Sequence, residues 1–414
     1  MLNKLFTFLL LALPILDVYG IGITGFSIGK ILLLLVSLIL VIKDRLNIKL
    51  YFNKFFIILL TLLVIVSFIL NISEDWFSIK DYIHKLIAIG GFYFTLCLAL
   101  QYVDWDRALK YYKILVWICS IFFFIQFSAF YFAEIRIIGI IPHIPLAIDR
   151  SSTEIIEMQE NLSRFTSFFL EPAHFAYYIA IYYIILAFRE ENPFTNKEFL
   201  FLSLVLLLLQ SGNGLMIMGV VVIISTFKIL LSKQSKKGTN IFIVLLLFIV
   251  GGITFSHFSN NEAVNKNLGR INEISFNQDN KKGSSGYQRI FSGYTFLSEV
   301  EQDKLWLGLG LGNQNAYYHS HDMPTFRSEI TNADSQYVYL NSIQLIIAWG
   351  GVVSLLFFGL YTYRLTKNNT LTGRTMMIAF IISCFIASGL FGTYMLFFLL
   401  FSIHYQRVRA QQIS

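Results

Sequence analysis

Residues 55–71 read FFIILLTLLVIVSFILN, a run in which no side chain is charged. A helix needs roughly 20 mainly apolar residues to cross the hydrocarbon core of a bilayer. The run is therefore typical of a membrane-spanning helix. Comparable runs lie on both sides of it, near residues 5–24, 26–42, 84–102, 114–133, 167–188, 241–257 and 337–362.

Two further apolar stretches are too long for one span each. Residues 199–231 contain Gly212 and Gly214, and residues 375–404 contain Gly389 and Gly392, where a helix can be interrupted. Each stretch therefore predicts two spans. We expect an all-α, polytopic integral membrane protein of about twelve transmembrane helices, with residues 1–414 forming a single transmembrane domain.

The composition agrees with this class. Apolar residues make up 56% of the chain and charged residues 14%, against about 45–50% and about 25% in ordinary soluble domains. This excludes an ordinary soluble or disordered chain. Cys97, Cys119 and Cys384 all lie inside apolar runs, which argues against a disulfide or a zinc site.

The basic residues predict the orientation. If the N-terminus is cytoplasmic, 19 of the 32 Lys and Arg residues fall in cytoplasmic connections, as the positive-inside rule requires. Twelve spans then place both termini of a multi-pass membrane protein in the cytoplasm. Two long segments, 134–166 and 258–336, remain on the outer face, where long ordered loops usually carry function.

The first outer segment leads into Phe168-Phe169-Leu170-Glu171-Pro172-Ala173-His174. Proline is well tolerated at the first position of a helix, so we expect a helix that begins at Pro172. A carboxylate at the edge of an apolar helix is costly and often functional. By helical spacing Glu171, His174 and Tyr178 share one face. A purely structural role, in which Glu171 caps the helix and His174 bonds within the core, stays open.

The second outer segment contains an expected amphipathic helix over residues 286–297. Its predicted apolar stripe consists of Tyr287, Ile290, Phe291, Tyr294 and Leu297. Such a helix can lie on the membrane surface or cover a cavity. Arg289 stands at its start, and Arg270 precedes it.

A glycine series follows, Leu307-Gly308-Leu309-Gly310-Leu311-Gly312-Asn313. It lacks the lysine and hydroxyl of a P-loop, so it is not a nucleotide loop. A flexible turn and a close backbone approach to a substrate are both compatible with it. His319 and His321, followed by Asp322, form too small a set to indicate a metal site. We expect no metal and no other cofactor.

These groups suit a particular chemistry. Outward-facing arginines bind phosphate in a bidentate fork, and tyrosines offer sugars an apolar face with a polar tip. A lone carboxylate can take a proton from an attacking hydroxyl. Because no ATP motif is present, the energy must reside in the substrate, as in a pyrophosphate-linked lipid. Nucleic acid is not an expected partner.

At this point the chain resembles a known family, the bacterial O-antigen and exopolysaccharide repeat-unit polymerases (Wzy-like), which are related to O-antigen ligases. Three motifs carry the resemblance, in this order: Arg164-x-x-x-Phe168-x-x-Glu171-Pro172; Tyr287-Gln288-Arg289 with the glycine series; and Asp334-Ser335-Gln336-Tyr337 opening a span with Trp349-Gly350-Gly351. The twelve-span layout and the large late outer loop extend the resemblance over most of the chain.

The resemblance implies a GT-C-like, inverting, metal-independent glycosyltransferase of the bacterial inner membrane. Such enzymes transfer a growing glycan from undecaprenyl pyrophosphate to a lipid-linked repeat unit, in O-antigen (lipopolysaccharide), capsule or exopolysaccharide synthesis, and a chain-length regulator can act beside them. By this resemblance Arg289 contacts the donor pyrophosphate, and Arg164 is a second phosphate clamp. Arg270 is a weaker candidate for that role. Glu171 activates or orients the acceptor hydroxyl. The substrate-binding candidates are His174, Tyr178, Asn313, His319, His321, Asp334 and Tyr337.

Alternative functions stay open. An O-antigen ligase would use the same donor with lipid A core as acceptor, but Asp334 stands where such ligases often carry histidine. A flippase or transporter should have charged residues in the middle of its membrane spans. In this chain only Asp17 and Glu171 fall within the predicted spans, and both lie near span ends. A scaffolding protein would leave the two outer loops unexplained. No arginine is followed eleven positions later by glycine in either loop, a pattern of some polymerases.

Overall fold

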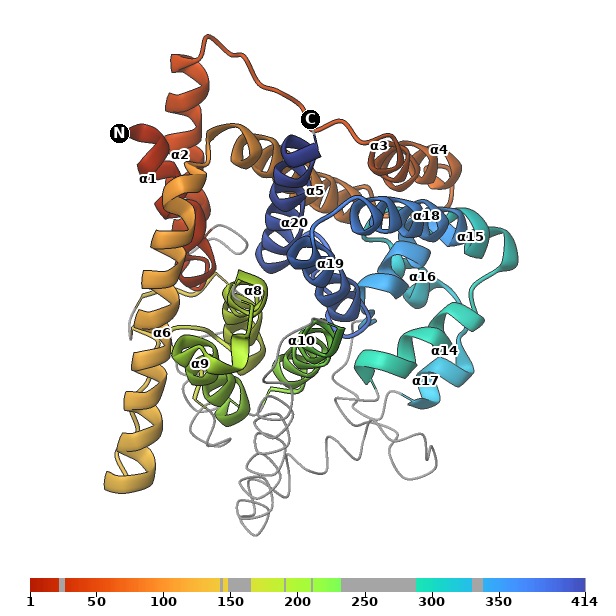
Figure 1. Ribbon diagram of the computed structural model, residues 1–414. Helices are drawn as coiled ribbons and strands as arrows, with labels where there is room; N and C mark the ends of the chain where they lie inside the picture. Colours follow the sequence, from red (N-terminus) through yellow and green to blue (C-terminus); the bar gives the residue numbers. More distant parts are fainter. Residues whose placement is uncertain are drawn as a thin grey trace. The chain divides into compact units, whose positions relative to one another are not determined.

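The structure is a computed structural model, and it describes residues 1–21, 27–141, 144–147, 165–189, 191–209, 211–231, 288–329 and 338–413. Within these ranges the chain is helical, as Figure 1 shows, and no strand forms. Two isolated bridges, Tyr19 with Leu146 and Gly20 with Ser27, are the β-type pairings there. The expected all-α fold class is confirmed for the part of the chain that the structure describes.

Five helices within the described residues are long and apolar enough to cross a membrane, judged by length and composition. They are Lys54–Asn71 (α3, η1 and α4), α5 (Ile79–Tyr102), α6 (Trp105–Ala133), α10 (Gly212–Leu231) and α18 (Ser342–Lys367). The total of twelve spans and their orientation stay predictions. The span expected at 241–257 lies outside the described residues.

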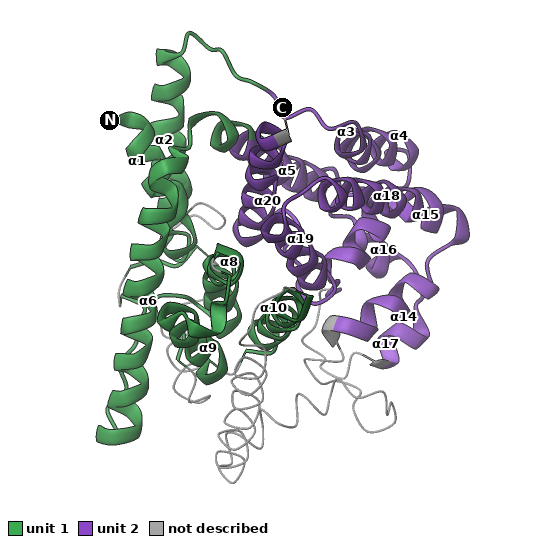
Figure 2. Cartoon of the chain, in the orientation of Figure 1, with its two compact units in different colours: residues 1–49, 97–265 green, residues 50–96, 266–414 purple. Residues whose placement is uncertain are grey.

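The chain divides into two compact units, coloured separately in Figure 2. Unit 1 comprises residues 1–49 and 97–265, and unit 2 comprises residues 50–96 and 266–414. The long helix α5 contributes its first part to unit 2 and its last turns to unit 1. The two units are described separately below.

Unit 1 is a bundle around α8 (Pro172–Arg189), which is buried on all sides from Phe175 to Ala187. Helices α9 (Lys197–Leu208) and α10 pack on it, and α6 packs against both α1 (Leu2–Leu16) and α8. α2 (Ile28–Lys43) pairs with α1. A short 3₁₀ turn, η2 (Pro193–Thr195), leads into α9. An apolar helix that is buried all round forms the core of its unit.

The first apolar run is shorter as a helix than its sequence indicates. The run extends over residues 5–24, but α1 ends at Leu16 and Asp17 occupies its C-terminal cap. The Asp17 carboxylate accepts a hydrogen bond from the Ser27 hydroxyl and lies 3.6 Å from the Lys30 ammonium. These polar partners hold the chain in a turn where the apolar pattern alone favours continued helix.

The expected interruption near Gly212 is confirmed, because α9 ends at Leu208 and α10 begins at Gly212. A second reason for glycine lies two residues later, at Gly214. A β-carbon on Gly214 would lie 2.9 Å from the Ala176 β-carbon of α8. Small residues on both helices thus allow close approach of α8 and α10.

Unit 2 is organised around α18, which packs against α3, α15 (Gln302–Leu307) and α19 (Leu371–Cys384). The last helix, α20 (Thr393–Ile413), pairs with α19. The interruption expected at Gly389 and Gly392 is confirmed, since α19 ends at Cys384 and α20 begins at Thr393. Three short helices complete the unit: α14 (Gly293–Ser298), α16 (Gln314–Ser320) and α17 (Pro324–Glu329).

The expected amphipathic helix forms, but its buried face differs from the prediction. Residues Gln288–Ser292 make a π-helical turn, η4, and α14 follows it directly. Phe296 is buried, whereas Tyr294, assigned to the apolar stripe, is 43% exposed. A π turn closes its hydrogen bonds one residue later than an α-helix and so rotates the face that follows. That rotation is the physical reason why the 3.6-residue pattern was wrong at Tyr294.

Candidate functional site

The helix start expected at Pro172 is confirmed. The Glu171 carbonyl accepts hydrogen bonds from the amides of His174 at 3.1 Å and Phe175 at 3.4 Å, so Glu171 directly precedes the first turn. Its side chain is exposed. The carboxylate makes no hydrogen bond or ion pair with the residues that the structure describes.

The segment that leads to Glu171 is held against α6. Ser167, with a φ of +54°, donates its hydroxyl to the Cys119 carbonyl at 2.8 Å. Its amide donates to the Gln126 side-chain oxygen at 2.9 Å. Both partners lie in α6, well before that helix ends at Ala133. The approach to Glu171 is therefore held from the middle of α6, well before the C-terminal end of that helix.

Aromatic stacking adds to this anchorage. The Phe168 ring stacks on Phe122 of α6, with centroids 4.3 Å apart and planes inclined by 7°. Phe169 stacks on Phe175 in α8 at 5.3 Å. Stacked aromatic pairs contribute about 0.5–1.5 kcal/mol beyond the area they bury. The two residues between Ser167 and Leu170 thus connect the approach to Glu171 with both helices.

The other predicted residues of this helix have different surroundings. His174 is half-buried. Tyr178 is fully buried, and its hydroxyl donates to the Leu11 carbonyl at 2.9 Å. Its own carbonyl accepts a hydrogen bond from the hydroxyl of Tyr112. The geometry gives Tyr178 a packing role inside unit 1, and its assignment to substrate is not supported by exposure.

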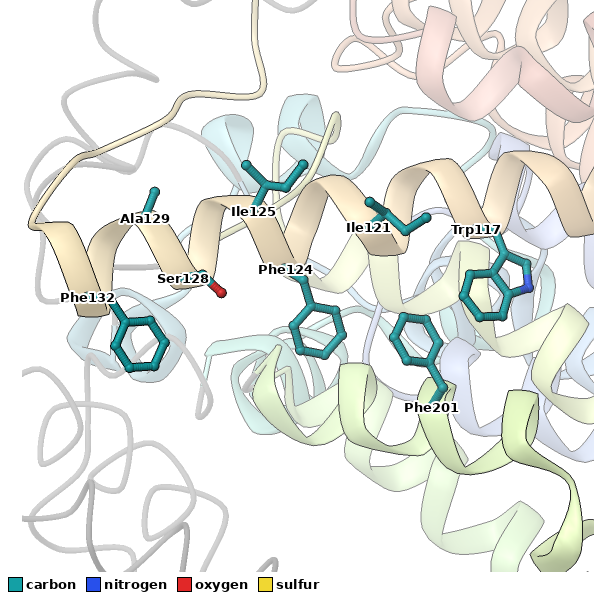
Figure 3. Close-up of a pocket in the computed structure, with 8 residues that line it drawn as sticks. All are labelled: Trp117, Ile121, Phe124, Ile125, Ser128, Ala129, Phe132 and Phe201. Carbon is teal, nitrogen blue, oxygen red and sulfur yellow. The ribbon is translucent and has the colours of Figure 1, made fainter.

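An apolar groove lies along the other side of α6, between that helix and α9 (Figure 3). Its volume is about 590 Å³. It follows α6 from Trp117 to Phe132, roughly 22 Å at the helical rise of 1.5 Å per residue. The remaining lining residues are Ile121, Phe124, Ile125, Ser128, Ala129 and Phe201. The groove is thus long and mainly apolar.

In unit 2 the glycine series packs against the protein's own backbone. Helix α18 is broken at Gly351, whose φ of 74° and ψ of 179° are not helical. The break releases backbone carbonyls that would otherwise bond within the helix. The amide of Leu309 donates to the Ala348 carbonyl at 2.7 Å, and that of Gly310 to the Trp349 carbonyl at 3.2 Å. The glycine series therefore donates hydrogen bonds to backbone carbonyls at the break in α18.

This contact explains why glycine alternates there. Gly308, Gly310 and Gly312 all have positive φ. A β-carbon on Gly308 would lie 2.4 Å from the Trp349 carbonyl oxygen, and one on Gly351 would lie 1.9 Å from that of Trp306. The glycines thus allow a close approach to the backbone of α18, and the expected approach to a substrate stays a prediction.

Two asparagines and a lysine tie the series to the end of α4. Asn71 is fully buried and donates to the Gly308 carbonyl at 3.0 Å. The Lys304 ammonium donates to the Asn71 side-chain oxygen at 3.0 Å and to the Glu74 carboxylate at 2.5 Å. Asn313, a predicted substrate contact, is also fully buried, and its side-chain oxygen accepts from the Ser78 amide at 2.6 Å. Asn313 thus has a structural role in this unit.

The two histidines near the end of the glycine series, His319 and His321, differ in their contacts. His321 stacks on Tyr317 with centroids 3.9 Å apart, and its ring nitrogen lies 2.8 Å from the Ser320 hydroxyl. His319 is exposed beside Tyr318. Throughout the described part of the chain, no three His, Cys, Asp or Glu side chains are close enough together to hold a metal ion.

Helix α17 is held by a carboxylate. Glu299 accepts hydrogen bonds from the amides of Thr325 at 2.8 Å and Phe326 at 3.0 Å. Partial burial raises the pKa of Glu299, but the bonds from Thr325 and Phe326 outweigh it and leave this pKa below its usual value. The charged form of Glu299 therefore stabilises the start of α17.

The remaining predicted site residues are not placed. Arg164, Arg270, Asp334 and Tyr337 lie outside the described residues. Arg289 lies in the π-helical turn η4, and the structure describes its backbone only. Their roles in binding phosphate or sugar stay predictions.

Sequence reasoning passed over two anchors, Gln126 and Asn71. Each is a polar residue within or at the end of an apolar run, which is a signal of buried hydrogen bonding or of function in a membrane. Applied to every such residue, that signal would have found both.

No protein-family model, no curated protein and no solved structure matches this chain.

Proposed function

We propose that this protein is an integral membrane glycosyltransferase that polymerises lipid-pyrophosphate-linked oligosaccharide repeat units. The placement of Glu171 carries the proposal. It is an exposed carboxylate at the start of a buried apolar helix, and the chain segment that precedes it is held against α6 by Ser167 and the Phe168 ring. An exposed carboxylate whose backbone is anchored to an apolar, membrane-length helix suits a reaction whose substrate is itself embedded in the bilayer.

The reaction is a glycosyl transfer with inversion. The acceptor hydroxyl attacks the anomeric carbon of the donor sugar, and the bond from that carbon to the pyrophosphate oxygen breaks. Glu171 takes the proton of the attacking hydroxyl, and the lipid pyrophosphate leaves with the electron pair. Arginines, with Arg164 and Arg289 as the candidates, neutralise the charge that develops on the leaving group.

The groove on α6 supports a lipid-linked substrate. It lies in the same unit as Glu171, on a helix that is long and apolar enough to span the bilayer. Its length and apolar lining suit a hydrocarbon chain, such as the isoprenoid tail of a carrier lipid. Apolar lining with few polar groups is typical of sites that take up a hydrocarbon ligand.

The test is product analysis. Purified protein receives an undecaprenyl-pyrophosphate-linked repeat unit and no nucleotide, and a ladder of longer lipid-linked glycans is expected. Transfer that occurs only when lipid A core is added would instead establish a ligase. If neither assay gives a longer or transferred glycan, the proposal of glycosyl transfer is overturned. Uptake of labelled lipid-linked substrate into vesicles would then test transport.

A matched pair of variants tests Glu171. Glutamine keeps the shape of the side chain but cannot take a proton, so Glu171→Gln should lose at least a hundredfold in turnover. Glu191→Gln, beyond the opposite end of α8, is the control and should retain wild-type turnover. Full activity in Glu171→Gln would leave that residue a purely structural role.

A further inference from the structure

Basic residues gather at the end of unit 2 where α18 stops. Residues 335–414 contain five lysines and arginines and no aspartate or glutamate. These five lie in the last turn of α18, at the start of α19 and near the end of α20: Arg364, Lys367, Arg374, Arg407 and Arg409. Positive charge at the end of a span also follows from the positive-inside rule. The arrangement of the side chains therefore decides whether they form a binding site.

Two of these arginines converge on the same backbone carbonyls. Arg374 donates its Nε to the Asn369 carbonyl at 3.1 Å and its Nη2 to the Lys367 carbonyl at 3.2 Å. Arg409 donates its Nη1 to the Asn369 carbonyl at 2.6 Å and to the Lys367 carbonyl at 3.5 Å. The two guanidiniums thus meet at the C-terminal end of α18. The dipole of that helix supplies only about half a negative charge there, against two positive charges.

The backbone that holds the two guanidiniums is itself fixed. Asn369 is 1% exposed. Its side-chain nitrogen donates to the Ser402 carbonyl at 2.8 Å and lies 2.9 Å from the Ser402 hydroxyl oxygen, which ties the turn between α18 and α19 to α20. A β-carbon on Gly373 would lie 2.0 Å from the Asn369 side-chain oxygen, so α19 also packs closely on this turn. Side chains that are ordered in advance lose less entropy when a ligand binds.

Both guanidiniums keep donors for a ligand. A guanidinium has five N–H donors. Arg374 donates through Nε and Nη2, and Arg409 through Nη1, so each commits at most two of them. Both side chains are partly exposed, and neither forms an ion pair with a carboxylate in the described part of the chain. The remaining donors and the uncompensated charge suit an anion that carries several oxygens.

The position of the two arginines indicates the anion. Helix α18 is long and apolar enough to cross a membrane, so its end lies at the depth of the lipid headgroups. Tyr363, one turn before Lys367, is 61% exposed and lies 5.7 Å from the Lys367 ammonium. Exposed tyrosines are enriched at this depth. Basic sites between helices at the membrane surface are typical binding sites for anionic lipid headgroups.

We propose that Arg374 and Arg409 form a binding site for the phosphate group of an anionic phospholipid at the C-terminal end of α18. The phosphodiester oxygens accept hydrogen bonds from both guanidiniums, and the negative charge of the lipid offsets their mutual repulsion. Because the two arginines belong to α19 and α20, the bound lipid joins these helices to α18. This binding is independent of glycosyl transfer.

The first experiment measures lipid binding to the detergent-purified full chain by native mass spectrometry, with phosphatidylglycerol as the probe. Arg374→Gln and Arg409→Gln each keep a neutral N–H donor for the carbonyls and remove the charge. Each should weaken binding at least tenfold. The control is Lys80→Ala, which removes one positive charge from an exposed position at the start of α5 in the same unit and should bind as the wild type does. Wild-type binding by both glutamine variants would overturn the proposal.

Two competitors identify the ligand. Phosphatidylcholine carries the same phosphate without net negative charge, and it should bind at least tenfold more weakly than phosphatidylglycerol. Equal binding of the two lipids would mean a general lipid contact and would overturn the charged site. Inorganic phosphate at the concentration of the lipid should not displace phosphatidylglycerol. Displacement would mean a site for a soluble anion and would overturn the assignment to a lipid.

A stability measurement needs no variant and therefore tests the proposal even if a glutamine variant fails to fold. A ligand that binds only the folded state stabilises it. Phosphatidylglycerol should raise the unfolding temperature of the wild-type protein, followed by circular dichroism in detergent, and phosphatidylcholine should not. The folded glutamine variants should lose this shift. An unchanged unfolding temperature of the wild type at saturating phosphatidylglycerol would overturn the proposal.

Discussion

Replacing Gly351 by alanine tests the account of the broken helix α18. Gly351 combines a φ of 74° with a ψ of 179°, a region that is essentially restricted to glycine. The added β-carbon would also lie 1.9 Å from the Trp306 carbonyl oxygen and 2.5 Å from the Leu307 amide nitrogen. Both atoms belong to backbone, so neither contact can be relieved by a side-chain rotation.

The two effects set the expected magnitude. Backbone strain of this kind costs about 1–3 kcal/mol. Forcing a carbon into a well-packed site costs about 1–3 kcal/mol more. Displacing Trp306 would also loosen the bonds from Leu309 and Gly310 that satisfy the break. We expect a loss of about 2–6 kcal/mol, which corresponds to a lowering of the unfolding temperature by at least about 4 °C in a unit of this size.

Buried cysteines provide the assay. Cys384 is fully buried in unit 2, whereas Cys97 and Cys119 are buried in unit 1. In a Cys97→Ala, Cys119→Ala background, a thiol-reactive fluorophore reports the unfolding of unit 2 alone. Gly359→Ala, in the same helix as Gly351, is the control. A β-carbon at Gly359 would have no neighbouring atom within 4 Å apart from the helix's own backbone. This variant should be neutral or stabilise by up to about 1 kcal/mol.

The reasoning would be refuted by either of two results. Exposure of Cys384 at the wild-type temperature in Gly351→Ala would show that the break does not depend on glycine. An equal lowering by Gly359→Ala would show that α18 tolerates no substitution, whatever its surroundings.

Three further predictions concern other parts of the molecule. Glu299 has a lowered pKa, so its stabilisation of α17 is complete above the ordinary carboxyl pKa and is lost as the pH falls through its folded value. Glu299→Gln should lose about 1 kcal/mol at neutral pH and flatten the acid limb of stability, measured by circular dichroism melting. Ala129→Trp fills the groove on α6 and should raise KM for the lipid-linked substrate severalfold. The control is Ile118→Trp, because Ile118 is exposed on the same helix but lies outside the groove. Equal KM values for the two variants would argue against a lipid tail in the groove. Glu74→Gln removes the carboxylate that pairs with Lys304, whose side chain is only 12% exposed, and should destabilise unit 2 by roughly 1–2 kcal/mol in thermal unfolding after allowance for solvent screening.

Much of the helical framework could be predicted from local signals. Proline at position 172 and the glycines at 212 and 389–392 correctly marked a helix start and two interruptions. Such residues act on their own backbone, so their effect is readable without any knowledge of neighbours. The same signals also directed attention to Glu171, which the structure places at a helix start and leaves exposed.

The limits of local patterns are equally specific. The apolar run of residues 5–24 contains a helix that ends at Leu16, because Asp17 finds Ser27 and Lys30 as partners. Tyr294 was assigned to a buried stripe that a π-helical turn rotates away from it. In both cases the deciding interaction involves a neighbour or a backbone geometry that hydrophobic periodicity does not record.

The apolar runs by themselves determined that this chain is helical and belongs to a membrane, because burial of apolar surface depends on composition along each segment. Only the tertiary structure decided what the polar residues between and within those runs do. The glycine series closes the break in α18, and Asn71 bonds to Gly308, 237 residues away along the chain. Gln126 likewise joins Ile137 to Ser167. Hydrogen bonds between distant segments depend on where folding brings their atoms, so no local pattern contains them.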